Sequence, residues 1–315
     1  MTRTIRTIVA LAATAAVWAA SNASVGTQGS APLSRMMVNG GEIEYETHGT
    51  GEPVLLIHGT GVAATFAPTM SQPSLAGYRL IRYHRRGYAG SSRGPGPAGV
   101  ARQAADCRAV LRHLGVERAH VVGHSYGGCV ALQLALDAPA VVGTLALLEP
   151  GLAVGASAAG YREALVRGAA RYREAGAAVA VDEFLQARWP GYGAALERAL
   201  PGAAAQAVAD AGTWFERELP GQLAWRFGEA EARRLTPPAL SVLGGESDAL
   251  WSRFGETHRL LLAWLPRAEG VVVPGTTHLM QLQDPRGVAA ALAAFWARHP
   301  LPAAAAPPPR PPAAR

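Results

Sequence analysis

Short apolar runs alternate with segments of helical periodicity along most of this 315-residue chain. The runs have the length of buried strands, and two parallel strands can be joined only by a crossover connection, usually a helix. The alternation therefore predicts an α/β fold, with a mostly parallel, twisted sheet of about eight strands and helices on both faces. We expect buried strands at 53–58, 78–83, 119–123, 142–148, 239–243 and 270–273, and helices at 100–114, 126–137, 254–265 and 288–298.

The pattern changes at the start of the core and once in its middle. Residues 36–47 alternate across Asn39-Gly40-Gly41, and Asn and Gly tolerate the positive φ of a tight hairpin turn, so two antiparallel strands are expected there. Between Pro150 and Thr236 the chain becomes rich in Ala and Arg and shows no convincing strand. We therefore expect residues 36–150 and 237–299 to form the α/β core, and residues 151–236 to form an inserted helical cap.

The two ends of the chain do not share the pattern of the core. Arg3 and Arg6 precede an apolar run at 8–20 that is shorter than the roughly 20 residues of a membrane span, so residues 1–23 are interpreted as a signal peptide for export. The alternative is a cytoplasmic protein whose translation starts at Met36 or Met37. Residues 300–315 are almost wholly Pro and Ala, which is typical of a disordered tail.

The net charge of +6 carries little information about partners. All 29 basic residues are Arg and they are scattered, with the densest cluster at 82–86. Nucleic-acid and anionic-membrane surfaces gather basic residues on one face, so we expect a small-molecule substrate, no nucleic acid and no stable membrane insertion. Cys107 and Cys129 have no metal-ligand spacing and are expected to be buried, with a disulfide between them left open. The oligomeric state is not predicted.

A candidate nucleophile lies between a predicted strand and a predicted helix. Gly123-His124-Ser125-Tyr126-Gly127 matches the G-x-S-x-G pattern, in which a sharp turn lifts a serine above the edge of a sheet. In a chain with 36 Gly the pattern alone is weak, and its position between strand and helix gives it weight. We expect Ser125 to be the nucleophile.

A serine hydroxyl needs a base, and the base needs a group that orients it. His278 and Asp248 both follow late strands of the expected parallel sheet, at the edge where sites in such sheets form. The chain order Ser, Asp, His also fits a strand-turn-helix nucleophile. We expect His278 to be the base and Asp248 the acid. Glu246 shares the loop of Asp248, and Glu149, which directly follows the strand at 142–148, is the first alternative.

Acyl transfer also requires fixed donors for the tetrahedral oxyanion. The backbone amides of Tyr126, which follows the nucleophile, and of Thr60, in the loop after the strand at 53–58, are expected to supply them. The chemistry requires no metal and no organic cofactor.

Five segments of the chain carry a recognisable pattern: 55–61 (LLIHGTG), 85–91 (RRGYAGS), 123–128 (GHSYGG), 245–248 (GESD) and 275–278 (GTTH). Together they resemble the α/β hydrolase superfamily, and the resemblance extends over residues 37–298. It is greatest to the branch of small esterases, lactonases, cofactor-free haloperoxidase-like enzymes and carbon–carbon bond hydrolases, and Ser125 stands where epoxide hydrolases and haloalkane dehalogenases have Asp. His84 departs from the Asp that is usual in the family, which puts a local loop contact in doubt.

The resemblance implies a serine hydrolase that cleaves an ester, lactone or related acyl bond through an acyl-enzyme, with a cap that influences substrate choice. Two other functions remain open from sequence alone. One is an acyltransferase or cofactor-free perhydrolase with the same triad, and the other is a ligand-binding protein that has kept the fold without turnover.

Overall fold

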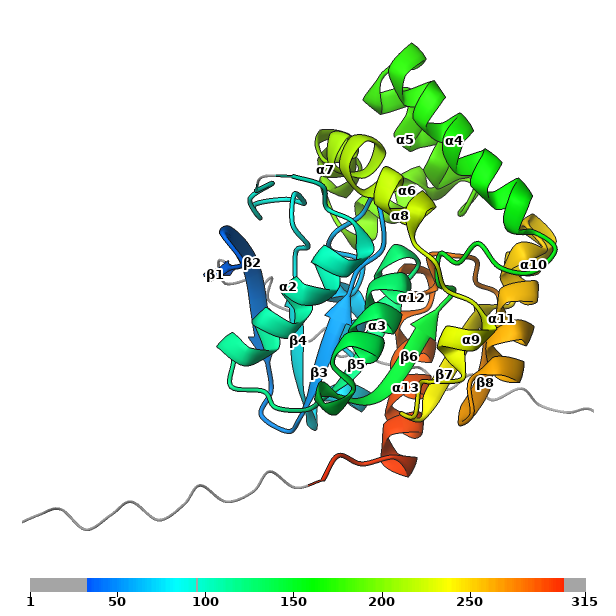
Figure 1. Cartoon of the computed structure of the whole chain (residues 1–315). Helices are drawn as coiled ribbons and strands as arrows, with labels where there is room; N and C mark the ends of the chain where they lie inside the picture. Colours follow the sequence, from blue (N-terminus) through cyan, green and yellow to red (C-terminus); the bar gives the residue numbers. More distant parts are fainter. Residues whose placement is uncertain (1–32, 95, 303–315) are drawn as a thin grey trace, which may run out of the picture. The chain divides into compact units, whose positions relative to one another are not determined.

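The computed structural model describes residues 33–94 and 96–302, so the expected signal peptide and nearly all of the expected tail lie outside the described residues. Its centre is one eight-stranded sheet in the order β1-β2-β4-β3-β5-β6-β7-β8 (Figure 1). The β1–β2 and β2–β4 pairs are antiparallel and the other five pairs are parallel, so the predicted fold class is confirmed. The strands are β1 Ser34–Val38, β2 Gly41–His48, β3 Glu52–Ile57, β4 Tyr78–Tyr83, β5 Ala119–His124, β6 Val142–Leu148, β7 Ala239–Gly244 and β8 Ala268–Val273.

Helices cover both faces of the sheet because its strand side chains are apolar on both faces. In β3, Leu55 and Ile57 join one apolar cluster, whereas Val54 and Leu56 join the other. The first cluster includes side chains of α2 Val100–His113, α3 Tyr126–Asp137 and α11 Arg253–Trp264, and the second those of α1 Ala67–Met70, η1 Pro73–Leu75 and α13 Pro285–Arg298. The cysteines Cys107 and Cys129 are both buried and both free thiols.

The segment between β6 and β7 is helical, and none of its described residues is in a strand. We call Ala158–Ala232 the cap; Figure 1 shows α4 to α8 gathered beyond one end of the sheet. Its apolar cluster also takes in Leu279 and Leu282, from the loop and short helix that follow β8. The cap elements are α4 Ala158–Ala175, α5 Ala177–Gln186, α6 Tyr192–Ala199, α7 Ala203–Ala209, the π-helix η3 Thr213–Glu218, α8 Leu219–Ala224 and α9 Glu229–Ala232. Among residues 33–94 and 96–302, no helix combines the length and the apolar character that a membrane crossing would require.

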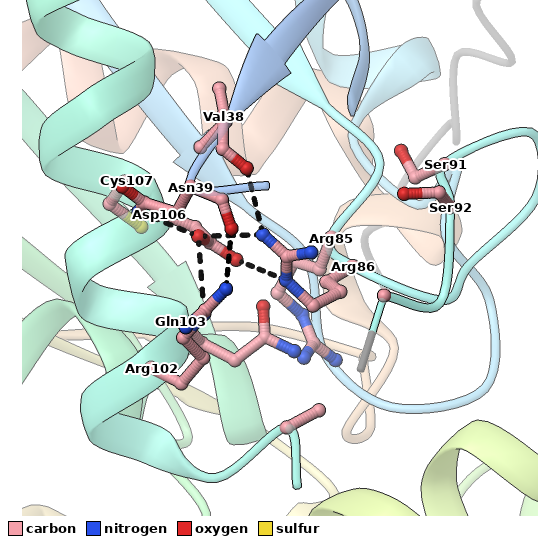
Figure 2. Close-up of polar contacts among 12 residues, drawn as sticks. Val38, Asn39, Arg85, Arg86, Ser91, Ser92, Arg102, Gln103, Asp106 and Cys107 are labelled. Atoms are coloured by element: carbon pink, nitrogen blue, oxygen red, sulfur yellow. Dashed lines mark hydrogen bonds and ion pairs between the residues drawn. The ribbon is translucent and has the colours of Figure 1, made fainter. Parts of the chain in front are cut away.

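The basic cluster at 82–86 is turned toward carboxylates inside the fold. Arg86 donates from Nε and Nη2 to the two carboxylate oxygens of Asp106, at 2.8 and 3.0 Å, and from Nη2 to the carbonyl of Val38 at 3.0 Å (Figure 2). Asn39 donates a further hydrogen bond to Asp106. This network joins the β1–β2 hairpin, the loop after β4 and α2, and both ends of the ion pair are buried.

The neighbouring basic residues are paired in the same way. Arg85 forms a fully buried ion pair with Glu218, at the end of the π-helix η3, and so ties the cap to the core. His84, which stands where the family usually has Asp, contacts Glu44 of β2 through Nδ1 at 3.1 Å. His84 therefore links the loop after β4 to the opening hairpin.

We expect Asp106→Ala to lower the free energy of unfolding by about 3–5 kcal/mol, because it leaves the buried guanidinium of Arg86 without its counter-charge. Chemical denaturation followed by circular dichroism measures this difference. Glu163→Ala is the matched control, since Glu163 pairs with Arg167 on the exposed surface of α4 and such pairs contribute less than about 1 kcal/mol. Equal losses for the two variants would contradict the assigned role of the buried pair.

Candidate active site

Ser125 occupies a strained turn between β5 and α3. Its φ is 52° and its ψ is −120°, a conformation that non-glycine residues rarely adopt. The amide of Ser125 donates to the carbonyl of Leu148 at 3.0 Å, and the carbonyl of Ser125 accepts from Gly151 at 2.9 Å. These bonds hold the turn against the end of β6. Strain of this kind persists only where the surroundings enforce it, and it is common at functional sites.

Glycines around Ser125 allow the chain to pass close to its neighbours. A Cβ atom at Gly127 would lie 2.2 Å from the carbonyl oxygen of Ile57, in β3. A Cβ atom at Gly123 would lie 2.4 Å from the carbonyl oxygen of Gly127. Any side chain at either position would push the helix away from the sheet. The G-x-S-x-G pattern is therefore a packing requirement as well as a sequence motif.

The structure brings His278 to Ser125, as expected from sequence. The two residues are 153 positions apart, and Ser125 Oγ lies 3.0 Å from His278 Nε2. Phe254 stacks on the imidazole with ring centroids 4.8 Å apart, and His124 Nε2 donates to the backbone carbonyl of His278 at 2.8 Å. The imidazole is thus held in one orientation, facing the hydroxyl.

The carboxylate beside His278 is that of Glu149, and the expected contact with Asp248 is not made. Glu149 Oε2 lies 2.7 Å from His278 Nδ1, and Glu149 Oε1 accepts from the amide of Gly244 at 2.8 Å. Asp248 is exposed in the short helix α10 Ser247–Leu250, where it accepts from the amide of Gly255. The helical turn of α10 directs this carboxylate toward α11. The alternative acid noted from sequence therefore occupies the position expected of Asp248.

Burial favours the neutral imidazole at neutral pH. It lowers the pKa of His278 well below the ordinary value, and the positive charges of Arg188 and Arg253 add to this effect. Burial also raises the pKa of Glu149, while the amide of Gly244 and the charge of Arg253 act in the opposite direction. With Nδ1–H donating to Glu149, Nε2 is left as an acceptor for the hydroxyl of Ser125.

The two residues whose backbone amides were expected to bind the oxyanion lie at the cavity of Ser125. Thr60 and Tyr126 line the same cavity as Ser125 and His278. Within residues 33–94 and 96–302, neither the amide of Thr60 nor that of Tyr126 donates a hydrogen bond to the backbone carbonyl of a turn, loop or helix cap. Arg85 supports the loop that carries Thr60, donating from Nε to the carbonyl of His58 and from Nη2 to the carbonyl of Gly59, at 2.9 and 3.0 Å.

The cavity over Ser125 is narrow and is shared by core and cap. Its volume is about 10 Å³, which is room for about one water molecule. A second cavity of about 50 Å³ shares three lining residues with it: Tyr161, Leu165 and Gln222. Sequence reasoning did not single out two of the residues that line the narrow cavity, Arg188 and Arg253, because scattered arginines give no local signal. Its full lining is Thr60, Ser125, Tyr126, Tyr161, Leu165, Phe184, Arg188, Trp214, Gln222, Arg253 and His278.

The described residues contain no group of three or more His, Cys, Asp or Glu side chains arranged to hold a metal ion. The site combines the hydroxyl of Ser125, the imidazole of His278, the carboxylate of Glu149 and the backbone amides of Thr60 and Tyr126. That donor set is suited to nucleophilic attack on a carbonyl group.

Known proteins with similar sequences match about a third of this chain. "Putative carbamate hydrolase RutD" of Azorhizobium caulinodans is 38% identical over 108 residues, which are 34% of this chain and 41% of that protein. A fluoroacetate dehalogenase of a Burkholderia species is 34% identical over 128 residues, 37% of this chain and 41% of that protein. The matches thus span about two fifths of the length of these curated relatives.

Solved structures match over a greater length. A thermophilic esterase from Thermogutta terrifontis superposes with a TM-score of 0.73 at 22% identity, over 85% of this chain and all of that chain. At this level of identity the likeness concerns the fold. A model of the alpha/beta hydrolase family matches residues 54–291, which is well over half of the sequence. The chain therefore belongs to the alpha/beta hydrolase family.

Proposed function

We propose that this protein is a serine hydrolase that cleaves an ester, lactone or related acyl bond of a small organic molecule. The observation that carries the proposal is the unbroken line of hydrogen-bonding groups from Ser125 Oγ through His278 to Glu149, with distances of 3.0 and 2.7 Å. Glu149, at one end of this series, is buried, and Ser125, at the other end, lines a cavity. A set of groups in this order makes a serine hydroxyl nucleophilic.

In the first half of the proposed reaction, His278 Nε2 takes the proton of Ser125 as Oγ attacks the carbonyl carbon. The amides of Thr60 and Tyr126 stabilise the oxyanion, and Glu149 stabilises the imidazolium that forms. His278 then gives its proton to the departing alcohol, which leaves an acyl group on Ser125. In the second half, His278 takes a proton from water, the water oxygen attacks the acyl carbon, and Ser125 regains its proton as the acid leaves.

The narrow cavity favours small substrates, and its walls indicate that the cap influences which ones are accepted. Tyr161, Phe184, Arg188 and Trp214 all come from the cap segment and line the cavity over Ser125. The second cavity, on the side of Gly151, offers further room for one end of a substrate. The similar proteins include a putative carbamate hydrolase and a fluoroacetate dehalogenase, so they do not select one bond type for this chain.

The proposal is tested with a panel of short and long acyl esters, lactones and thioesters. We expect wild-type protein to hydrolyse at least one class, and Ser125→Ala to lose at least about 10³-fold in kcat, because the nucleophile is gone. A fluorophosphonate probe should label the wild type and not the variant. Turnover that survives in Ser125→Ala would contradict the proposal, and methanol as a competing acceptor distinguishes hydrolysis from acyl transfer to alcohols.

The role of Glu149 is tested against that of Asp248 with two isosteric variants. We expect Glu149→Gln to lower kcat by roughly 10³- to 10⁴-fold, since the amide does not stabilise the imidazolium and favours the wrong tautomer of His278. Asp248→Asn should change kcat by less than about threefold, because its carboxylate is exposed and contacts α11. The reverse order of effects would show that Asp248 reaches His278 during turnover.

A further inference from the structure

Two arginines line the cavity over Ser125 without a carboxylate partner in the described part of the chain. Arg253 is 2% exposed; its Nη2 donates to the carbonyls of Pro150 and Leu152, at 3.4 and 3.2 Å, and its Nε has no partner. Arg188, two residues beyond α5, donates only to the carbonyl of Phe184, at 3.0 Å, and its guanidinium lies 3.4 Å from the centre of the Phe184 ring. Each group therefore keeps unused donors at the cavity.

Buried arginines elsewhere in the described part of the fold are paired with carboxylates. The buried side chains of Arg82, Arg85 and Arg86 each form an ion pair with a carboxylate. Leaving a buried charge unpaired is costly, so proteins seldom do so without a functional reason. Arg253, which is buried, and Arg188, which is half-buried, have no such partner among the described residues, and both line the cavity that holds Ser125 and His278.

The charges around the cavity do not balance. Glu149 is the carboxylate nearest to the imidazole, and it is already engaged by His278 and by the amide of Gly244. Gln222 and the phenol of Tyr161, which are uncharged, complete the polar part of the cavity wall near Arg253. Burial and the charge of Arg253 lower the pKa of Arg188, which reflects the same excess of positive charge. One anionic group from a ligand would relieve it.

We propose that Arg188 and Arg253 form a subsite for a carboxylate carried by the substrate, so that the enzyme prefers acyl compounds with a second, negatively charged group. This inference rests on the proposed serine hydrolase activity and names its substrate class. A carboxylate suits the site because it is small and planar. It accepts hydrogen bonds from the N–H groups at the edge of a guanidinium, and this edge stays accessible when an aromatic ring covers the guanidinium face. Arg253 already lies over the ring of Tyr161, at 3.9 Å.

The test compares charged and neutral esters of the same length. Mono-p-nitrophenyl glutarate against p-nitrophenyl pentanoate places the charge on the acyl side, and 3-acetoxybenzoate against phenyl acetate places it on the leaving group. We expect wild-type kcat/KM to favour the charged member of at least one pair by at least about tenfold. Arg188→Met and Arg253→Met should each lower the ratio of kcat/KM for the charged member to that for the neutral member by roughly 10- to 100-fold, mainly through the KM of the charged member.

The controls separate charge recognition from folding. Arg167→Met removes an exposed arginine of α4 and should leave both members of each pair unchanged. Arg253→Lys keeps the charge and should retain part of the preference for the charged ester. If wild type hydrolyses neutral esters equally well, or the Met variants slow both members equally, the carboxylate subsite is wrong while the hydrolase proposal stands.

A binding measurement keeps the two proposals distinguishable if no ester is hydrolysed. Glutarate and inorganic phosphate are titrated into Ser125→Ala by calorimetry, with and without Arg188→Met. We expect glutarate to bind and the added substitution to weaken it by at least about tenfold. Failure of glutarate to bind, or binding of phosphate alone, would overturn the carboxylate subsite, whereas absent turnover with intact glutarate binding would overturn only the hydrolase activity.

Discussion

The close approach of Ser125 to its neighbouring strands is the constraint on which the rest of the site depends. The turn between β5 and α3 is bonded to the end of β6 through Leu148 and Gly151, and glycine is needed where it meets β3. A non-glycine residue at positive φ costs about 1–3 kcal/mol, so only a tightly packed surrounding maintains it. The same bonds place the residue after Leu148 directly behind the imidazole. Glu149 also has a positive φ, of 42°, so both Ser125 and the residue that holds the imidazole of His278 are in strained backbone conformations.

Much of the core could be predicted from the sequence because its signals are local. The apolar runs become β3 to β8 with boundaries shifted by no more than two residues, and the Asn39-Gly40 turn closes β1 on β2 with positive φ at both residues. Ser125 and His278 could be placed together because parallel strands end at one edge of a sheet. That rule holds for any residue at the edge, and so it brings several candidates together without choosing among them.

The carboxylate partner shows where this kind of reasoning stops. Glu149 and Asp248 follow β6 and β7, two neighbouring strands paired in register, so both were expected near the same edge. What separates them is the local path of the chain after each strand. Glu149 follows β6 immediately and is held by the turn at Ser125, whereas Asp248 lies four residues beyond β7 in a helical turn that leads away toward α11. The only signal in the sequence was that Glu149 stands directly between the end of an apolar strand and Pro150.

The arginines were beyond local reasoning because their partners lie far away in sequence. Arg85 and Glu218 are 133 residues apart, and their ion pair connects the π-helix of the cap to the loop that carries Thr60. The proposed carboxylate subsite likewise takes Arg188 from the cap segment and Arg253 from the core. The Arg85–Glu218 ion pair and the proposed subsite therefore both involve residues of the cap and of the core. A displacement of the cap would separate Arg188 from Arg253 and also disturb the loop of Thr60, so the proposed binding of an anionic group and the proposed oxyanion role of Thr60 both depend on the position of the same segment.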